Sequence, residues 1–151
     1  QGGIVFWLDG NGGGLISAPT DQSSGAVWCD SSCYGNYISG ADGTAIGTGA
    51  QNTVDIVNTG CGIAADLCAN LTLGGYSDWF LPSKDELNEM YLNIGQGNAL
   101  GLGNVGGFAN NFYWSSTEYD YYDAWLQYFS DGYQSNGNKL TNLTVRAVRA
   151  F

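Results

Sequence analysis

The stretch from 113 to 139 carries most of the side chains that could bind a ligand. Six of the ten tyrosines lie between Tyr113 and Tyr133, among Asp, Ser and Asn. Tyrosine offers a large, stiff contact area at low entropic cost, and Ser, Asn and Gly add adaptable hydrogen bonds, as in antibody loops. Aromatic faces also stack on sugar rings, whose hydroxyl groups bind to Asp and Asn. We therefore predict a ligand-binding surface that consists of Glu118, Tyr119, Asp120, Tyr121, Tyr122, Asp123, Tyr128, Asp131, Tyr133, Asn136 and Asn138.

The same stretch also contains residues that favour a structural role. Large aromatic side chains dominate the buried area of protein cores, so we predict that Trp114, Trp125 and Phe129 are core residues. The tyrosine rings could then simply cover the edges of a sheet. Binding residues and core residues are expected to alternate along this stretch.

Four acidic residues in or beside this stretch raise the question of a metal site. Asp120, Asp123, Asp131 and Glu118 could supply some of the roughly six to eight oxygen ligands that calcium takes. No D-x-D-x-D-G loop is present, and a solvated acidic face is the better interpretation. We predict no cofactor, with calcium as the alternative.

The sequence offers little for catalysis. It contains no histidine, which removes the usual general base, the Ser-His-Asp triad and most zinc sites. A carboxylate pair such as Asp120 with Asp123 could hydrolyse glycosides, but nothing in the sequence marks either residue as buried. We predict that the protein is not an enzyme.

Composition and net charge limit the class of protein and the kinds of partner that it can bind. The chain has 151 residues, with 44% apolar residues, 12% charged residues and 24 glycines, which indicates one loop-rich globular domain over 1–151. A formal net charge of −10 repels phosphate backbones, so we expect neither nucleic-acid binding nor binding to anionic membranes. No apolar window is long enough for membrane insertion, and no signal peptide is visible. Because Gln1 leads directly into a strand-like run, we expect a mature or excised segment of a longer protein.

The four cysteines suit an exported protein, because disulfides persist in oxidising compartments. If one helix carried both Cys61 and Cys68, they would lie about 10 Å apart and could not form a disulfide. We therefore expect disulfides between the 29–33 loop and the 61–68 segment. The alternative is buried free thiols in a cytosolic protein. The C-x-x-x-C spacing of Cys29 and Cys33 does not support thioredoxin-like chemistry.

The apolar patterns predict the elements that position these residues. Residues 2–9 and 14–19 form a hairpin around "GNGG", and 23–49 form an ordered loop. Residues 50–70 have a helical pattern that is interrupted at "TGCG". Ser83 and Glu86 form a capping box at the start of a helix that extends to residue 95.

Three further segments have the pattern of strands: "FYWSSTE" (112–118), "AWLQYFS" (124–130) and "LTVRAVRAF" (143–151). The last has apolar residues on both faces, so we expect it in the centre of its sheet. These elements predict an α+β fold, in which two helices pack on a small, twisted, mainly antiparallel sheet with long ordered loops.

Several sequence blocks resemble one known family. "GGYSDWFLPSKDEL" (74–87), "YWSSTE" (113–118), "AWLQYFSDG" (124–132) and "VRAVRAF" (145–151) together resemble the Lcl C-terminal domain family, found at the ends of bacterial surface proteins that include collagen-like adhesins. The resemblance implies a C-type-lectin-like fold. Some relatives are also similar to the variable proteins of diversity-generating retroelements, in which Asn codons mutate to Tyr, Asp and Ser. The calcium–sugar motifs "EPN" and "QPD" are absent.

The resemblance also implies a function and a location. We expect an extracellular or cell-surface domain that binds a glycan or protein ligand on another cell or surface. The alternative is a structural subunit of a surface fibre or cell-envelope assembly. The sequence leaves the oligomeric state open: a monomer that binds a ligand fits recognition, and a homo-oligomer is the alternative, either a trimer, as relatives with collagen-like stalks imply, or a fibre.

Overall fold

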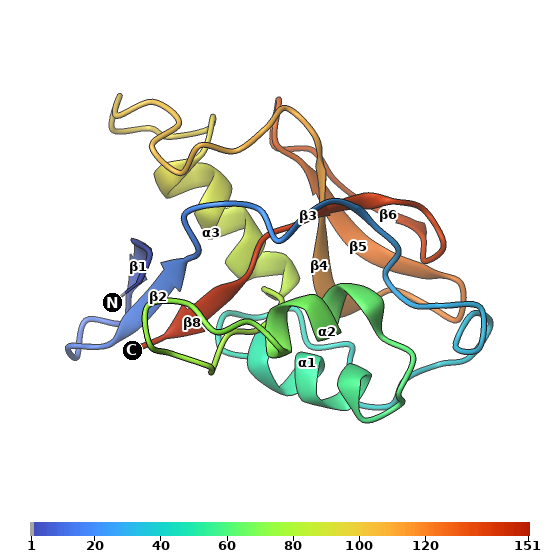
Figure 1. The fold of residues 1–151 in the computed structure, drawn as a ribbon. Coiled ribbons are helices and arrows are strands. Elements are labelled where there is room, and N and C mark those ends of the chain that lie inside the picture. Colours follow the sequence, from blue (N-terminus) through green and yellow to red (C-terminus); the bar gives the residue numbers. More distant parts are fainter. Residues whose placement is uncertain (1) are drawn as a thin grey trace.

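The computed structural model describes residues 2–151, so Gln1 and the expectation attached to it lie outside the described residues. The described chain folds into helices and strands that form two sheets (Figure 1). The helices are α1 (Gly49–Val57), α2 (Ile63–Ala69) and α3 (Lys84–Ile94). The strands are β1 (Ile4–Leu8), β2 (Gly14–Ser17), β3 (Ser23–Ala26), β4 (Phe112–Glu118), β5 (Asp123–Tyr128), β6 (Gln134–Asn138), β7 (Leu143–Val145) and β8 (Val148–Ala150).

The strands form two sheets, where the sequence predicted one. A three-stranded sheet has the order β1-β2-β8, and a five-stranded sheet has the order β3-β7-β4-β5-β6. Every pairing is antiparallel except that of β4 with β7, so the prediction of mainly antiparallel strands is confirmed. The strands β3 and β6 were not predicted, because their sequences "SSGA" and "QSNGN" contain no β-branched or aromatic residue.

The predicted N-terminal hairpin is present as β1 and β2. Its turn is held by Asp9, whose carboxylate accepts hydrogen bonds from the backbone N–H groups of Asn11 (2.7 Å) and Gly13 (2.9 Å). Gly10 and Gly12 have positive φ angles, which other residues rarely adopt. The polar residues of this turn therefore have a structural role.

The capping box at the start of α3 is present as predicted. The backbone N–H of Glu86 donates to Ser83 Oγ (3.3 Å), and the backbone N–H of Ser83 donates to Glu86 Oε2 (2.7 Å). These two hydrogen bonds satisfy backbone N–H groups that the start of a helix otherwise leaves unpaired. Leu87, Met90 and Ile94 are the buried apolar residues of the helix.

The helical pattern of 50–70 forms two helices, so the described chain has three helices where two were predicted. The break falls at the predicted place, and Gly60 there has a φ of 75°. A Cβ atom at Gly62 would lie 2.1 Å from a side-chain carbon of Ile56, so only glycine allows α2 to begin this close to α1.

The strand β4 lies between two hydrophobic cores. Its adjacent residues Tyr113 and Trp114 point to opposite faces, as successive strand residues do. Trp114 packs in the core that contains residues of α1 and α2, and Tyr113 packs in the core that contains Phe129 and residues of α3, β1 and β2. The core prediction is confirmed for Trp114 and Phe129 and is wrong for Trp125, whose side chain is only half-buried.

The C-terminal segment forms two strands in different sheets, where one central strand was predicted. It changes sheets at the buried residues Arg146 and Ala147. β7 is the second strand of its sheet, between β3 and β4, and β8 is last in the order of its own. Phe80 completes the outer side of β8 with two backbone hydrogen bonds to Val148 (2.8 and 2.9 Å). This change of sheet connects the two cores.

Candidate functional site

The β5–β6 hairpin divides the predicted binding residues into two groups. Asp123 pairs with Asn138 at one end of the hairpin, and Gln127 pairs with Gln134 toward the other. Four residues of strand span roughly 13 Å. Tyr119 to Asp123 and Asn138 therefore lie at one end, while Tyr128 to Tyr133 lie at the other, and Asn136 lies between them in β6.

A second, distant segment joins the first of these ends. In Figure 1 the blue-to-cyan loop that follows β3 meets the orange turn between β4 and β5 at the right-hand end of the molecule. The backbone N–H of Gly35 donates to the carbonyl oxygen of Tyr121 (3.1 Å), and the Asn138 amide donates to the Tyr34 hydroxyl (2.7 Å). The two segments therefore form one surface.

Tyrosine rings from both segments pair across this junction. The ring centroids of Tyr34 and Tyr122 lie 5.4 Å apart in an edge-to-face arrangement, and those of Tyr37 and Tyr121 lie 5.9 Å apart. Tyr121 is 56% exposed, Tyr122 is 54% exposed and Tyr37 is 44% exposed. We call these four residues the tyrosine surface.

The sequence predicted only half of the tyrosine surface. Tyr121 and Tyr122 were in the predicted set, whereas Tyr34 and Tyr37 were not, because they belong to a loop more than eighty residues earlier. A signal was present, since the "CYGNY" stretch around them repeats the Tyr, Gly and Asn composition of the predicted surface.

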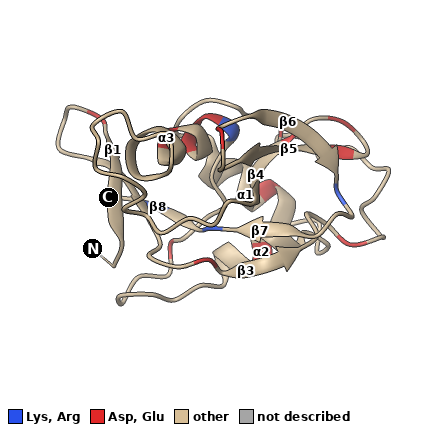
Figure 2. Ribbon diagram, turned by 90° about the horizontal axis from the view of Figure 1, so that it is seen from above, with Lys and Arg blue, Asp and Glu red and all other residues tan. Residues whose placement is uncertain are grey.

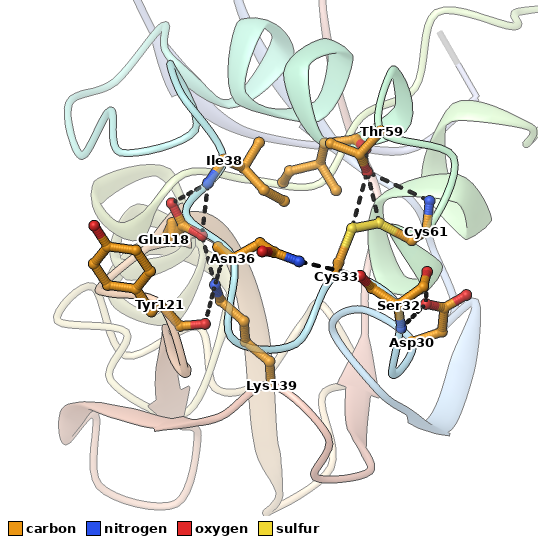
Figure 3. The surroundings of a disulfide bond; sticks show 11 residues. Asp30, Ser32, Cys33, Asn36, Ile38, Thr59, Cys61, Glu118, Tyr121 and Lys139 are labelled. Atoms are coloured by element: carbon orange, nitrogen blue, oxygen red, sulfur yellow. Dashed lines mark hydrogen bonds and ion pairs between the residues drawn. A yellow bond between two sulfur atoms is a disulfide. The ribbon is translucent and has the colours of Figure 1, made fainter.

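Glu118 lies beneath the tyrosine surface and not on it. Its side chain is 2% exposed, and its carboxylate accepts hydrogen bonds from the Lys139 ammonium (2.5 Å) and from the backbone N–H of Ile38 (2.9 and 3.1 Å), as Figure 3 shows. Burial raises the pKa of Glu118, and the hydrogen bond from Lys139 opposes that rise. The prediction that Glu118 belongs to the exposed surface is therefore wrong.

Lys139 connects the segments that carry the tyrosines. Its buried ammonium also donates to the carbonyl oxygens of Tyr121 (3.2 Å) and Asn36 (3.4 Å), and its backbone N–H donates to the carbonyl oxygen of Tyr122 (2.9 Å). These bonds satisfy the ammonium, as a buried charge requires. One buried ion pair thus holds the backbone on both sides of the tyrosine surface, and no local sequence pattern predicted this ion pair.

A disulfide anchors the loop that carries Tyr34 and Tyr37. Cys33 is bonded to Cys61, with 5.9 Å between their Cα atoms, so one of the predicted connections between the 29–33 loop and the 61–68 segment is confirmed (Figure 3). Cys29 and Cys68 are buried free thiols. Burial raises the pKa of Cys29 to about 11 and raises that of Cys68 further, which keeps both thiols protonated.

The acidic residues near the tyrosine surface are arranged around the β4–β5 turn. Asp120 accepts hydrogen bonds from the backbone N–H groups of Tyr122 and Asp123, both at 2.8 Å. The pKa of Asp123 is raised, mainly by burial and then by the negative charge of Asp120. On the other segment, Asp42 accepts a hydrogen bond from the Tyr37 hydroxyl (3.0 Å), which raises the pKa of that tyrosine.

These carboxylates do not form a cation cage. Among residues 2–151 there is no group of three or more His, Cys, Asp or Glu side chains placed to hold a metal ion. The carboxylate of Asp120 binds backbone N–H groups, and that of Glu118 binds Lys139.

The far end of the hairpin forms a smaller aromatic patch. Tyr128 stacks on Phe112, with ring centroids 4.4 Å apart, and Tyr133 is 62% exposed. Asp131 is exposed and accepts a hydrogen bond from the backbone N–H of Tyr133 (2.9 Å). Tyr119, in the first group, does not pair with another tyrosine ring; its ring lies edge-on to the half-buried Trp125 (5.3 Å).

No helix within residues 2–151 is both long and apolar enough to cross a membrane.

Comparison with known proteins identifies the family. A comparison with curated protein sequences found no match. The family model of the Lcl C-terminal domain matches residues 18–149, which include the tyrosine surface, the three helices and the five-stranded sheet, but not β1 and β2. The three helices and the two mainly antiparallel sheets fit the C-type-lectin-like α+β fold that the resemblance implied. The chain therefore belongs to the Lcl C-terminal domain family, a family of bacterial surface domains.

Proposed function

We propose that this domain is an extracellular recognition module that binds a glycan or protein ligand on another cell or surface through the tyrosine surface. One observation carries the proposal: tyrosines from two distant segments are exposed together, above a buried Glu118–Lys139 ion pair. The Cys33–Cys61 disulfide supports an extracellular location, because such bonds persist in oxidising compartments.

The construction of the tyrosine surface favours binding. Its backbone is held by the Lys139 ammonium, the Gly35–Tyr121 hydrogen bond and the disulfide. The backbone therefore loses little conformational entropy when a ligand binds. A tyrosine side chain has only two rotatable bonds to fix. A rigid backbone with exposed aromatic side chains is therefore suited to recognition.

We propose that the domain has no catalytic role and needs no cofactor. The sequence has no histidine, and the buried carboxylate of Glu118 is already paired with an ammonium. The carboxylate of Asp120, the acidic residue in the β4–β5 turn, already accepts hydrogen bonds from two backbone N–H groups.

The same arrangement supports a relationship to diversity-generating retroelements. Tyr119, Tyr121 and Tyr122 are each at least half exposed, while the backbone of the turn is hydrogen-bonded to the rest of the fold. Substitution at these positions would change what the surface contacts and leave the core unchanged. A reverse transcriptase gene next to this one, with a near-copy of its 3′ end that differs at adenines, would establish the relationship.

The proposed function is tested by removing the exposed rings. The double variant Tyr121→Ala with Tyr122→Ala is compared with the wild type on a glycan array and in binding to host-cell surfaces. The double variant Tyr128→Ala with Tyr133→Ala, at the far end of the hairpin, is the control. We expect binding to be lost only in the first. Unchanged binding by the Tyr121 and Tyr122 variant would disprove the site.

A second function is favoured by a different surface. The strand β1 is first in the order of its sheet, and an apolar groove lies between it, α3 and the loop after α3. Leu8 is 66% exposed, Leu100 is 77% exposed and Leu102 is 60% exposed. Exposed strand edges and apolar patches favour association between chains. This observation supports a structural subunit of a surface fibre or envelope assembly.

Light scattering separates the two functions. A monomer that binds a ligand supports recognition, whereas assembly without a ligand supports the structural subunit. In the second case, replacing Leu100 and Leu102 with Ser would reduce assembly, and the Tyr121 and Tyr122 double variant would assemble as the wild type does.

A further inference from the structure

The cations of the chain are already placed over aromatic rings. Lys and Arg are rare in this sequence, which has four of them against fourteen acidic residues. The cation-to-centroid distances are 3.9 Å for Lys84 over Trp125, 5.1 Å for Lys139 over Trp28, 4.3 Å for Arg146 over Phe108 and 3.7 Å for Arg149 over Tyr76. A cation is attracted by the negative face of an aromatic ring at such distances.

The tyrosine surface has rings but no cation over them. Among residues 2–151, no Lys or Arg lies over Tyr34, Tyr37, Tyr121 or Tyr122. Lys139 lies beneath this surface, but its side chain is fully buried and its charge is balanced by Glu118. The exposed parts of the Tyr37, Tyr121 and Tyr122 rings therefore have no cation of the described chain over them.

Carboxylates surround these rings. Asp42 is exposed and bound to the Tyr37 hydroxyl, and Asp120 and Asp123 lie at the two ends of the turn that carries Tyr121 and Tyr122. Figure 2 shows acidic positions (red) at this end of the molecule, and a basic position (blue) where the chain leaves β6. The net charge of −10 adds to the negative potential of the site.

We propose, on the basis of the function proposed above, that the partner of the tyrosine surface is a basic segment of a protein. Its Lys or Arg side chains lie against the tyrosine rings and face the carboxylates of Asp42, Asp120 and Asp123. The charge of the partner then complements that of the surface, which raises the association rate and excludes acidic ligands. A neutral glycan would stack on the rings and donate hydrogen bonds to the carboxylates, but it would not neutralise their charge.

Salt dependence and probe charge test the proposal. The probes are fluorescein-labelled hexalysine, hexaglutamate with the same label, and a neutral cello-oligosaccharide, and binding is followed by fluorescence anisotropy or by titration calorimetry. We expect hexalysine to bind and its affinity to fall at least about tenfold between about 50 mM and about 500 mM NaCl, because salt screens exposed charges. Hexaglutamate is expected not to bind.

A matched pair of aspartates separates local recognition from general attraction. Asp120 and Asp131 each accept a hydrogen bond from the backbone N–H two residues later, and Asn retains that acceptor. Asp120→Asn and Asp131→Asn therefore change the net charge equally, at opposite ends of the hairpin. We expect Asp120→Asn to weaken hexalysine binding about three- to tenfold and Asp131→Asn to weaken it less than about twofold.

The outcomes distinguish this inference from the proposed function. Equal losses in the two aspartate variants would show general attraction by the net charge and overturn the inference. Binding of the neutral oligosaccharide without binding of hexalysine would also overturn it, and would leave the proposed function standing if the Tyr121→Ala and Tyr122→Ala variant lost that binding. Host-surface binding that survives in this tyrosine variant would overturn both.

Discussion

Removing the Lys139 ammonium should destabilise the whole domain. Lys139→Met retains most of the side-chain volume but leaves the Glu118 carboxylate buried, with the backbone N–H of Ile38 as its remaining partner. It also removes the donor to the carbonyl oxygens of Tyr121 and Asn36. The variant therefore tests whether the buried ion pair holds the tyrosine surface in place.

The magnitude follows from the burial of both charges. Two unit charges about 3 Å apart attract by roughly 5–6 kcal/mol at an effective dielectric constant of about 20. The carboxylate that remains can recover part of this by taking up a proton, since burial already raises the pKa of Glu118. Loss of one partner of a buried pair typically costs about 3–5 kcal/mol, which is a large part of a total stability of about 5–15 kcal/mol. We expect a loss in this range.

Urea unfolding followed by tryptophan fluorescence measures the loss, because Trp28 and Trp114 are fully buried. The double variant Lys139→Met with Glu118→Gln is the control. It removes both charges, so it should recover most of the stability that the single variant loses. A loss below about 1 kcal/mol in Lys139→Met, or equal losses in the single and double variants, would refute this reasoning.

Three further predictions concern stability. Burial raises the pKa of Glu86, so the folded protein binds protons more readily than the unfolded chain, and its unfolding free energy should rise as the pH falls from about 7 to about 5. A lower urea midpoint at the lower pH would contradict this. Replacing Cys33 and Cys61 with Ser should cost roughly 3–4 kcal/mol, since the disulfide closes a loop with a sequence separation of 28; unchanged thermal unfolding would argue against it. Gly49→Ala should cost more than about 2 kcal/mol, because its Cβ would lie 2.2 Å from Glu86 Oε2 and 2.7 Å from the Ser83 nitrogen. Circular dichroism melts measure that loss, and a wild-type melting temperature would contradict it.

The sequence predicted well what local interactions decide. The Ser83–Glu86 capping box needs only residues three positions apart, and it was predicted to the residue. The N-terminal hairpin and the break before α2 depend on glycines close in the sequence. The assignment of Trp114 and Phe129 to the core follows from side-chain size.

Long-range interactions explain what the sequence did not predict. Tyr34 joins Tyr122, and Glu118 joins Lys139, only because the 30–42 loop, the β4–β5 turn and the end of β6 meet in space. Glu118 follows three polar residues (115–117) and is directly followed by the exposed Tyr119, so nothing local marks it as buried. The segment 143–151 has the pattern of one strand, and its division between two sheets depends on the partners that the rest of the chain provides.

The placement of the cations has a practical consequence for protease digestion. Lys139 is fully buried, Arg146 is 1% exposed and Arg149 is 8% exposed, while Lys84 is half-buried at the start of α3. Trypsin cleaves only after Lys and Arg, so three of its four sites within residues 2–151 lie at buried residues of the folded domain. Cleavage after Lys139 or Arg146 then requires the chain to open, and its rate reports that opening. Trypsin is thus a probe of unfolding for this domain, and an intact band after brief digestion measures the folded fraction.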